Sequence, residues 1–353
     1  MRSILTIHCT KLVHNLNAVK AQLKDGVKVY AVVKDNAYGH GIEGIAKYLA
    51  PKVDGFCVAR VEEGITLRTI GIQNPILVFE LPELEKASWF KEHNLIATVG
   101  DINDFDTLVE GTQYHINFDT GMGRLGIPYS QYELAIEKYK SSSQLTCTGI
   151  YTHFATADVA NSEGVVSQLA RFTEVRKVFP SNIMAHTANT GAIFNYSDLE
   201  IQFDAVRPGV CLYGYAPGST KIDALIPVIE WESHILQTRA VQKGDTIGYG
   251  ASWVAPEDGY IGTVPVGYSD GIQRRLGGKI QLKVNGKLYP QVGRITMDYI
   301  GIFTPTNDFH KGDKVTLLND KELSAEVWAQ LNETIPYEVT TALNSRIKRV
   351  FKD

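Results

Sequence analysis

Strand-like and helix-like segments alternate over the first 213 residues of this 353-residue chain, and this alternation limits its fold most strongly. Short apolar, β-branched runs predict buried parallel strands. Eight such runs occur, at residues 27–34, 55–59, 76–79, 96–99, 114–119, 146–153, 183–188 and 206–213. Helical spacing between them is clearest at residues 42–49, 61–70, 131–139 and 162–178. This order predicts an α/β fold, a (β/α)8 TIM-type barrel, with a doubly wound open sheet as the alternative.

The pattern changes from Ile226 onward, where short strand-like runs are separated by turns of glycine, asparagine and aspartate. Asn285-Gly286 between two such runs predicts a β-hairpin. Residues 324–332 are the one segment here with helical spacing, and Ser324 is their expected N-cap. We therefore predict a barrel domain at residues 1–226 and a mostly β C-terminal domain at residues 227–353. The strand predicted at residues 3–10 is a candidate to join the second domain.

Composition argues against several classes of function. The net charge is −4 and no basic run stands out, so we expect no nucleic-acid partner. No apolar run approaches the length of a membrane span, and the N-terminal residues are too polar for a signal peptide. Four cysteines lie far apart, without the spacing of a metal site: Cys9, Cys57, Cys147 and Cys211. We expect reduced thiols, no metal and a cytoplasmic location.

Polar residues gather where the predicted strands end, which is where barrels place their active sites. The first strand ends on Lys34 and is followed by Asn36, Tyr38 and His40. A lysine at a strand end usually just extends to solvent, but a lysine beside a tyrosine, an asparagine and a histidine suggests a site. Similar segments follow later strands, at residues 119–126, 152–158, 186–192 and 206–214.

These segments resemble those of the alanine racemases, enzymes that depend on pyridoxal 5′-phosphate (PLP) and have fold type III. The Val-Lys-Asp-Asn-Ala-Tyr-Gly-His-Gly string at residues 33–41 is similar to the family's cofactor-lysine segment, and the resemblance extends from Val29 to Arg349. It implies interconversion of L- and D-alanine, an isomerase reaction that supplies D-alanine for cell-wall peptidoglycan. It also implies that Lys34 binds the cofactor as a Schiff base.

The resemblance implies a full set of cofactor contacts: Lys34, Tyr38, Arg124, His153, Asn189, Thr190, Arg207, Gly209, Val210 and Tyr337. Among them, Tyr38, Thr190, Tyr337 and the backbone of Gly209 and Val210 match the phosphate site. Arg207 matches the arginine that faces the ring nitrogen. A guanidinium there keeps this nitrogen unprotonated, so the ring is a weaker electron sink and side reactions are disfavoured. His153 matches a histidine against the ring, and Arg124 an arginine near the substrate carboxylate.

The second domain contains segments that resemble the rest of the family's site. Tyr249, in Gly-Tyr-Gly-Ala-Ser, matches the second catalytic base, because racemisation needs proton transfer on both faces of the α-carbon. Tyr268 matches an entrance residue, and Met297 a residue whose backbone N–H meets the substrate carboxylate. In the family these residues come from the partner subunit. The resemblance therefore implies a homodimer with shared active sites and an amino-acid substrate.

One departure from the family pattern concerns charge. Asn117 stands where many members have a carbamylated lysine, an anion that would lie beside Arg124. Asparagine brings no charge, so we expect a small bound anion, such as chloride, near Asn117 and Arg124. Thr190 in place of serine and Trp253 in place of tyrosine remove no catalytic atom.

Three alternatives remain open. A racemase of serine or another small amino acid could use the same scaffold, although Tyr337 favours alanine because serine-selective relatives tend to have asparagine there. A PLP decarboxylase is disfavoured by Arg207, since such enzymes usually place an acid at the ring nitrogen. A non-catalytic PLP-binding homeostasis protein would lack the β domain and Tyr249.

Overall fold

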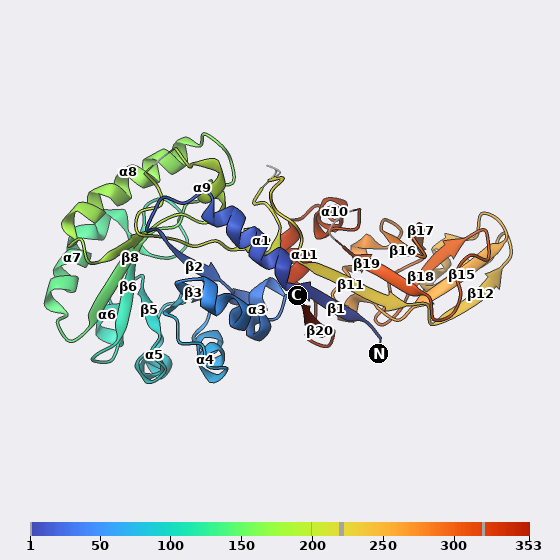
Figure 1. Cartoon of the computed structure of the whole chain (residues 1–353), viewed down its shortest axis with the longest axis horizontal. Coiled ribbons are helices and arrows are strands. Elements are labelled where there is room, and N and C mark those ends of the chain that lie inside the picture. Colours follow the sequence, from blue (N-terminus) through green and yellow to red (C-terminus); the bar gives the residue numbers. More distant parts are fainter. Residues whose placement is uncertain (1, 199, 219–221, 320–321) are drawn as a thin grey trace. The chain divides into compact units, whose positions relative to one another are not determined.

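A computed structural model describes residues 2–198, 200–218, 222–319 and 322–353 of the chain. The chain divides into two compact units, whose elements are labelled in Figure 1. The barrel unit comprises Val13–Ala37 and Gly41–Leu225. The β unit combines Met1–Leu12, Tyr38–His40 and Ile226–Asp353. The second unit thus includes residues from both ends of the sequence and a three-residue segment that begins four residues after Lys34.

Within the described residues, eight parallel strands close into a barrel in the first unit. They are β2 (Lys28–Val32), β3 (Gly55–Val58), β4 (Ile76–Val78), β5 (Ile96–Val99), β6 (Gln113–Asp119), β8 (Thr146–Tyr151), β9 (Met184–His186) and β10 (Ala205–Val206). Their order is β5-β4-β3-β2-β10-β9-β8-β6, and pairing of β5 with β6 closes the circle. The predicted barrel is confirmed. The doubly wound alternative is wrong, because an open sheet would leave β5 and β6 unpaired with each other.

Helices alternate with the barrel strands along the chain, beginning with α1 before β2, as the sequence pattern predicts (Figure 1). They are α1 (Cys9–Lys20), α3 (Ile42–Leu49), α4 (Val61–Thr69), α5 (Ala87–Glu92), α6 (Asp104–Thr107), α7 (Tyr132–Ser141), α8 (Glu163–Val178) and α9 (Thr190–Asn195). Every residue of β3, β4 and β5 is buried. Such strands have both faces covered, which is why their sequences are continuously apolar rather than alternating.

The last predicted barrel strand is shorter than expected. We predicted a strand over residues 206–213, but only Ala205–Val206 pairs, and Val210–Tyr213 forms a 3-10 helix, η4. Pro208 has no N–H to donate to a strand ladder. Gly209 then has φ −117° and ψ −101°, outside the β region, so the chain leaves the barrel at this point.

In the described part of the β unit, nine strands form one sheet in the order β12-β15-β18-β17-β16-β19-β11-β1-β20. Their bounds are β12 (Gln237–Val241), β15 (Gly259–Val264), β18 (Ile300–Thr304), β17 (Lys287–Val292), β16 (Gln281–Val284), β19 (Lys314–Leu318), β11 (Ile229–His234), β1 (Ile4–His8) and β20 (Lys348–Lys352). β1 pairs antiparallel with β11 and parallel with β20. The N-terminal strand is therefore part of this sheet.

Local signals in the β unit account for its turns and helices. Asn285 (φ 50°) and Gly286 (φ 81°) both have positive φ and join β16 to β17, as the two-residue hairpin requires. α10 (Ala325–Leu331) is capped by the Ser324 side chain, as predicted. A second helix, α11 (Pro336–Thr341), was not expected, because six residues are too few to show helical spacing.

Short elements complete the described structure. They are β7 (Ile127–Pro128), the ribbon β13 (Thr246–Ile247) and β14 (Trp253–Val254), and the 3-10 turns η1 (Ala50–Lys52), η2 (Leu84–Lys86), η3 (Tyr129–Gln131), η5 (Tyr249–Ala251), η6 (Tyr268–Asp270) and η7 (Arg274–Leu276). Among the described residues, none of the helices has the length and apolar character that crossing a membrane requires. Over the same residues, His, Cys, Asp and Glu side chains form no cluster that could hold a metal ion.

Candidate active site

Lys34 follows the first barrel strand and begins a short turn of left-handed helix, α2 (Lys34–Tyr38). The sequence pattern indicates only a loop at these residues. Asp35, Asn36, Ala37 and Tyr38 have φ values of 53°, 55°, 53° and 52°. This conformation costs roughly 1–2 kcal/mol for each L-residue. Four such residues in succession are rare, so surrounding bonds must hold the turn in place.

Hydrogen bonds around Asn36 supply this support. Its side-chain oxygen accepts from the Ile42 N–H at 2.9 Å, and its carbonyl oxygen accepts from the Gly41 N–H at 2.9 Å. Its own N–H donates to Glu63 Oε1 at 3.3 Å. The turn therefore fixes where the side chain of Lys34 begins. That side chain is 36% exposed, with its Nζ 3.9 Å from Asp35 Oδ2.

Electrostatics show that four of the predicted residues lie near one another. Burial, together with the positive charges of three side chains, lowers the pKa of His153 to about 3. In decreasing order of effect, these are Arg207, Arg124 and Lys34. His153 is therefore a neutral ring among cations, at the carboxyl ends of the barrel strands.

Arg207 is almost fully buried at 2% exposure, and its guanidinium is held by hydrogen bonds. Nη2 donates to the carbonyl oxygens of Thr152 at 2.7 Å and Thr187 at 3.1 Å. Nη1 donates to the carbonyl oxygen of His186 at 2.9 Å and lies 2.5 Å from Nδ1 of the same histidine. Burial lowers the pKa of Arg207, but a guanidinium stays charged in proteins. The barrel thus holds a fixed internal cation.

Two histidines that connect to Arg207 were not predicted as site residues. His186 contacts Arg207 directly, and His115 contacts His186. Burial, followed by the charge of Arg207, lowers the pKa of His115 to about 3 and that of His186 well below its usual value. His115 lies two residues before Asn117 on β6, so both side chains point to the same face of the strand. This two-residue spacing from Asn117 was the sequence signal that could have identified His115 as a residue near the site.

The residues predicted to contact phosphate in the barrel unit are close together. Gly209 N–H donates to Thr190 Oγ1 at 3.1 Å, and Thr190 Oγ1 donates to Cys211 Sγ at 3.2 Å. Asn189 caps α9 by accepting from the Ala192 N–H at 3.0 Å. Its side-chain nitrogen lies 3.4 Å from His153 Nε2. Val210 begins η4 directly after Gly209. The ends of β8, β9 and β10 thus contribute neighbouring polar groups.

The β unit brings together the two tyrosines that were also predicted to contact phosphate. The ring centroids of Tyr38 and Tyr337 are 5.9 Å apart. Gly39 permits this approach, because a Cβ there would lie 1.9 Å from the carbonyl oxygen of Thr340. Arg349 holds the same segment by donating two hydrogen bonds to Gly39 O, at 2.7 and 2.9 Å. The unpredicted helix α11 therefore positions Tyr337.

The three remaining predicted residues line one cavity of about 490 Å³ in the β unit. Tyr249, Tyr268 and Met297 are 71%, 42% and 53% exposed. Tyr268 N–H donates to Thr296 O at 3.0 Å, and Ser269 N–H donates to Met297 O at 3.1 Å. These bonds join the segments that carry Tyr268 and Met297, so their positions depend on each other.

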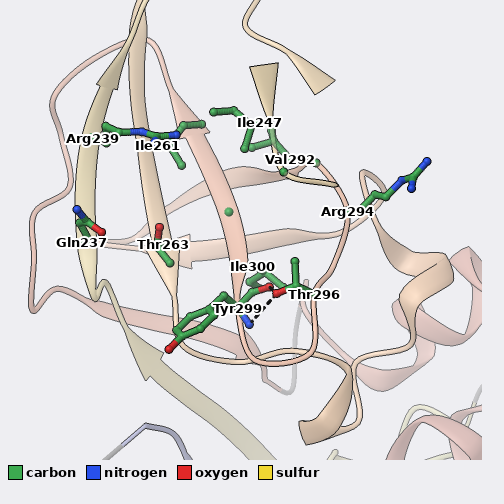
Figure 2. A pocket seen from close by; sticks show the side chains of 13 residues that line it. Gln237, Arg239, Ile247, Ile261, Thr263, Val292, Arg294, Thr296, Tyr299 and Ile300 are labelled. Carbon is green, nitrogen blue, oxygen red and sulfur yellow. Dashed lines mark hydrogen bonds between the residues drawn. The ribbon is translucent and has the colours of Figure 1, made fainter. Parts of the chain in front are cut away.

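A second cavity, of about 210 Å³, lies on the sheet of the β unit (Figure 2). Its apolar lining includes Ile247, Ile261 and Ile300, and a Tyr299 N–H bond to Thr296 Oγ1, at 3.2 Å, crosses its edge. None of the described residues around it belongs to the predicted site. Arg294, which sequence reasoning did not single out, lines both cavities.

Comparison with known proteins identifies the family. The model "Alanine racemase, N-terminal domain" matches residues 7–217, and "Alanine racemase, C-terminal domain" matches residues 228–351. The alanine racemase of Streptococcus mutans is 34% identical over 358 residues, which cover 98% of this chain and 95% of the relative.

Solved structures agree with this match. Alanine racemase from Clostridium difficile superposes with a TM-score of 0.93 at 30% identity, covering 100% of this chain and 96% of that one. The Bartonella henselae enzyme, solved with covalently bound pyridoxal phosphate, has a TM-score of 0.90 at 28% identity, with both chains covered fully. The predicted family is confirmed: this chain belongs to the alanine racemases, a family of PLP-dependent amino-acid racemases.

Proposed function

We propose that this chain binds PLP in its barrel unit and uses it to interconvert L- and D-alanine. The main support is the cluster around His153, where Lys34, Arg124 and Arg207 are close enough to lower the histidine's pKa. An amine, two guanidiniums and a neutral imidazole at barrel strand ends suit an anionic cofactor and a carboxylate substrate.

The chemistry of the barrel residues fits PLP. Lys34 supplies a partly exposed primary amine that would hold the cofactor covalently. The Gly209–Val210 backbone and Thr190 would hold its phosphate, together with Tyr38 and Tyr337. Asn189 would fix the ring of His153 beside the cofactor. When bound, PLP supplies an electron sink that stabilises negative charge at the α-carbon of the substrate.

Arg207 would face the ring nitrogen of the cofactor. Its guanidinium already donates to three carbonyl oxygens, so it is oriented before any ligand arrives. A guanidinium donates hydrogen bonds but does not transfer a proton at neutral pH, and it accepts no hydrogen bond. Arg207 would therefore bind the nitrogen without protonating it, which limits how much negative charge the ring accepts.

Proton transfer would use two bases on opposite faces of the substrate, Lys34 and Tyr249. Tyr249 is 71% exposed in the single chain and lines a cavity with Tyr268 and Met297. We propose that this cavity meets the barrel of a second copy, so that a homodimer contains two equivalent shared sites. In that site the neutral His153 of one subunit would hydrogen-bond the Tyr249 hydroxyl of the other and tune its basicity.

Arg124 would bind the substrate carboxylate, with an anion beside it in place of the carbamate found in relatives. Asn117 is buried at 6% exposure, and Nδ2 donates to Leu125 O at 3.0 Å. The same NH2 group has a second hydrogen, which could be donated to chloride. Charge supports such an anion. Asn117 is neutral, so without a bound anion the positive charge of Arg124 would have no counter-charge at this position.

A chiral assay tests the function. The protein is incubated with PLP and either L- or D-alanine, and the enantiomers are separated at intervals. Both reactions should end near equal amounts of the two forms, because enantiomers have equal free energy. Faster turnover of serine would favour the serine racemase alternative. Tight PLP binding without turnover of either amino acid would favour the non-catalytic alternative.

A further inference from the structure

The side chain of Gln168, on α8, is buried at 3% exposure, and the hydrogen bonds of its amide connect two loops of the candidate site. Its oxygen accepts from the Ala155 N–H at 3.0 Å. Its nitrogen donates to His153 O at 2.9 Å and to Thr120 Oγ1 at 3.3 Å. One amide thus holds both sides of the His153–Ala155 segment and the start of the loop that leads to Arg124.

The Thr120 end of this connection continues to Arg207. Thr120 Oγ1 lies 2.8 Å from Thr152 Oγ1, and Thr152 O accepts from Arg207 Nη2 at 2.7 Å. From the same helix face, one turn beyond Gln168, Arg171 Nη1 donates to Thr120 O at 2.8 Å. α8 is therefore tied to the loops after β6 and β8, and through Thr152 to the guanidinium.

The backbone beyond Thr120 leaves room for this arrangement. A Cβ on Gly121 would lie 3.1 Å from Gln168 Cγ, closer than nine in ten such contacts, so glycine lets the glutamine pack against the loop. Asp119 then orders the next residues: its Oδ1 accepts from the N–H groups of Gly121 at 2.9 Å and Met122 at 2.8 Å. The Arg124 loop is thus held by Gln168 on one side and by Asp119 on the other.

Glutamine at this position contributes both to stability and to geometry. An apolar side chain of the same size would leave the Ala155 N–H and the His153 carbonyl oxygen without this partner, which destabilises the fold. The amide also fixes direction, because its donors and its acceptor must point at fixed atoms.

We propose that Gln168 is a positioning residue for the racemase site: it sets the ring of His153 and the loop of Arg124 relative to Arg207. This inference rests on the proposed function, because it assigns Gln168 a role in that same site. Gln168 itself is not placed in contact with substrate or cofactor.

The test compares Gln168→Met, which keeps the volume and removes all three bonds, with the wild-type holoenzyme. Ser167→Ala is the matched control, because Ser167 is the exposed neighbour on the same helix. Gln168→Met should lower kcat about 10- to 100-fold in both directions. It should also change the visible circular dichroism of bound PLP, and Ser167→Ala should leave both unchanged.

Hydrogen exchange of the cofactor-free protein gives a reading independent of activity. The Ala155 amide, which donates to Gln168, should exchange faster in Gln168→Met, as should the peptide spanning residues 119–124. A lower unfolding temperature with unchanged kcat, dichroism and exchange would overturn the proposal, since only a structural role would remain.

A second pair of variants keeps the proposal testable if Gln168→Met does not fold. Thr120→Val removes the hydroxyl that meets both Gln168 and Thr152, and Thr120→Ser retains it. Thr120→Val should show the reduced kcat and altered dichroism, and Thr120→Ser should restore both. Equal behaviour of the two would contradict the proposal. If the wild-type protein binds PLP but racemises nothing, the proposed function fails. Circular dichroism and hydrogen exchange would still test whether Gln168 positions the site residues.

Discussion

His115 and His186 meet through their ring nitrogens, with His115 Nδ1 2.9 Å from His186 Nε2. Arg207 sets the direction of this contact. Because the guanidinium can only donate, His186 Nδ1 must accept from it, and His186 Nε2 then bears the proton that it donates to His115. The remaining proton of His115 is on Nε2, a buried atom with no partner among the described residues. Both rings must be neutral for this arrangement.

The protein should therefore lose stability as the pH falls from about 6.5 toward 3. Folding keeps His115, His153 and His186 neutral, but the unfolded chain protonates them below pH 6.5, so it binds more protons. Each histidine should steepen the fall of the unfolding free energy by about 1.4 kcal/mol per pH unit. Urea unfolding of the cofactor-free protein at a series of pH values measures this slope.

Variants show which histidine contributes to the pH dependence of the unfolding free energy. His115→Asn should lower the slope by one proton's contribution, whereas His310→Asn, at an exposed histidine, serves as the control. An unchanged slope in His115→Asn would mean that His115 is protonated in the folded protein.

Lys34 should be the lysine that holds the cofactor. Borohydride reduction of the PLP complex, followed by peptide mapping, should place the pyridoxyl group on Lys34, because it extends from the strained turn at the barrel rim. Lys34→Ala should abolish this labelling and lower racemisation by at least 10²-fold. Labelling mainly at another lysine would show that the motif has been misassigned.

Tyr249 should act as the second base. Tyr249→Phe should cut kcat about 10²- to 10⁴-fold in both directions and leave the visible absorbance of bound PLP intact. Tyr299→Phe is the control, because Tyr299 lines the same cavity at 43% exposure. A loss of similar size in the control would point to a general defect of the cavity.

A mixture of two inactive variants tests whether the site is shared. Half of the dimers formed from equal amounts of Lys34→Ala and Tyr249→Phe chains should be hybrids, and each hybrid has one site with both bases. Activity should therefore recover to about a quarter of the wild-type value. No recovery in a sample shown to contain mixed dimers would count against a shared site.

A halide should bind beside Asn117 and Arg124. In crystals grown with bromide, anomalous scattering should show a peak in contact with both side chains, because Arg124 lacks the counter-charge that a carbamate would supply. Asn117→Asp should supply that charge and remove the peak. Bicarbonate should not alter the activity, since no lysine at residue 117 is available for carbamylation. A clear bicarbonate dependence would reject this account.

The sequence by itself determined the elements and the residues at their ends. Apolar runs of strand length separated by helical spacing predict a barrel, Asn285-Gly286 predicts a hairpin, and Ser324 predicts a helix start, because each depends on neighbours within a few residues. Resemblance to a known family then assigned roles to the residues at the strand ends.

Only the tertiary structure decided how those residues are held. The left-handed turn after Lys34 opposes local preference and exists because Ile42, Gly41 and Glu63 hold Asn36. The contact of His115 with His186 joins residues 71 apart, and that of Gln168 with Thr120 joins residues 48 apart. A buried glutamine or histidine looks like any other in a sequence. Its role depends on which donors and acceptors the barrel places around it, and periodicity along the chain does not contain that information.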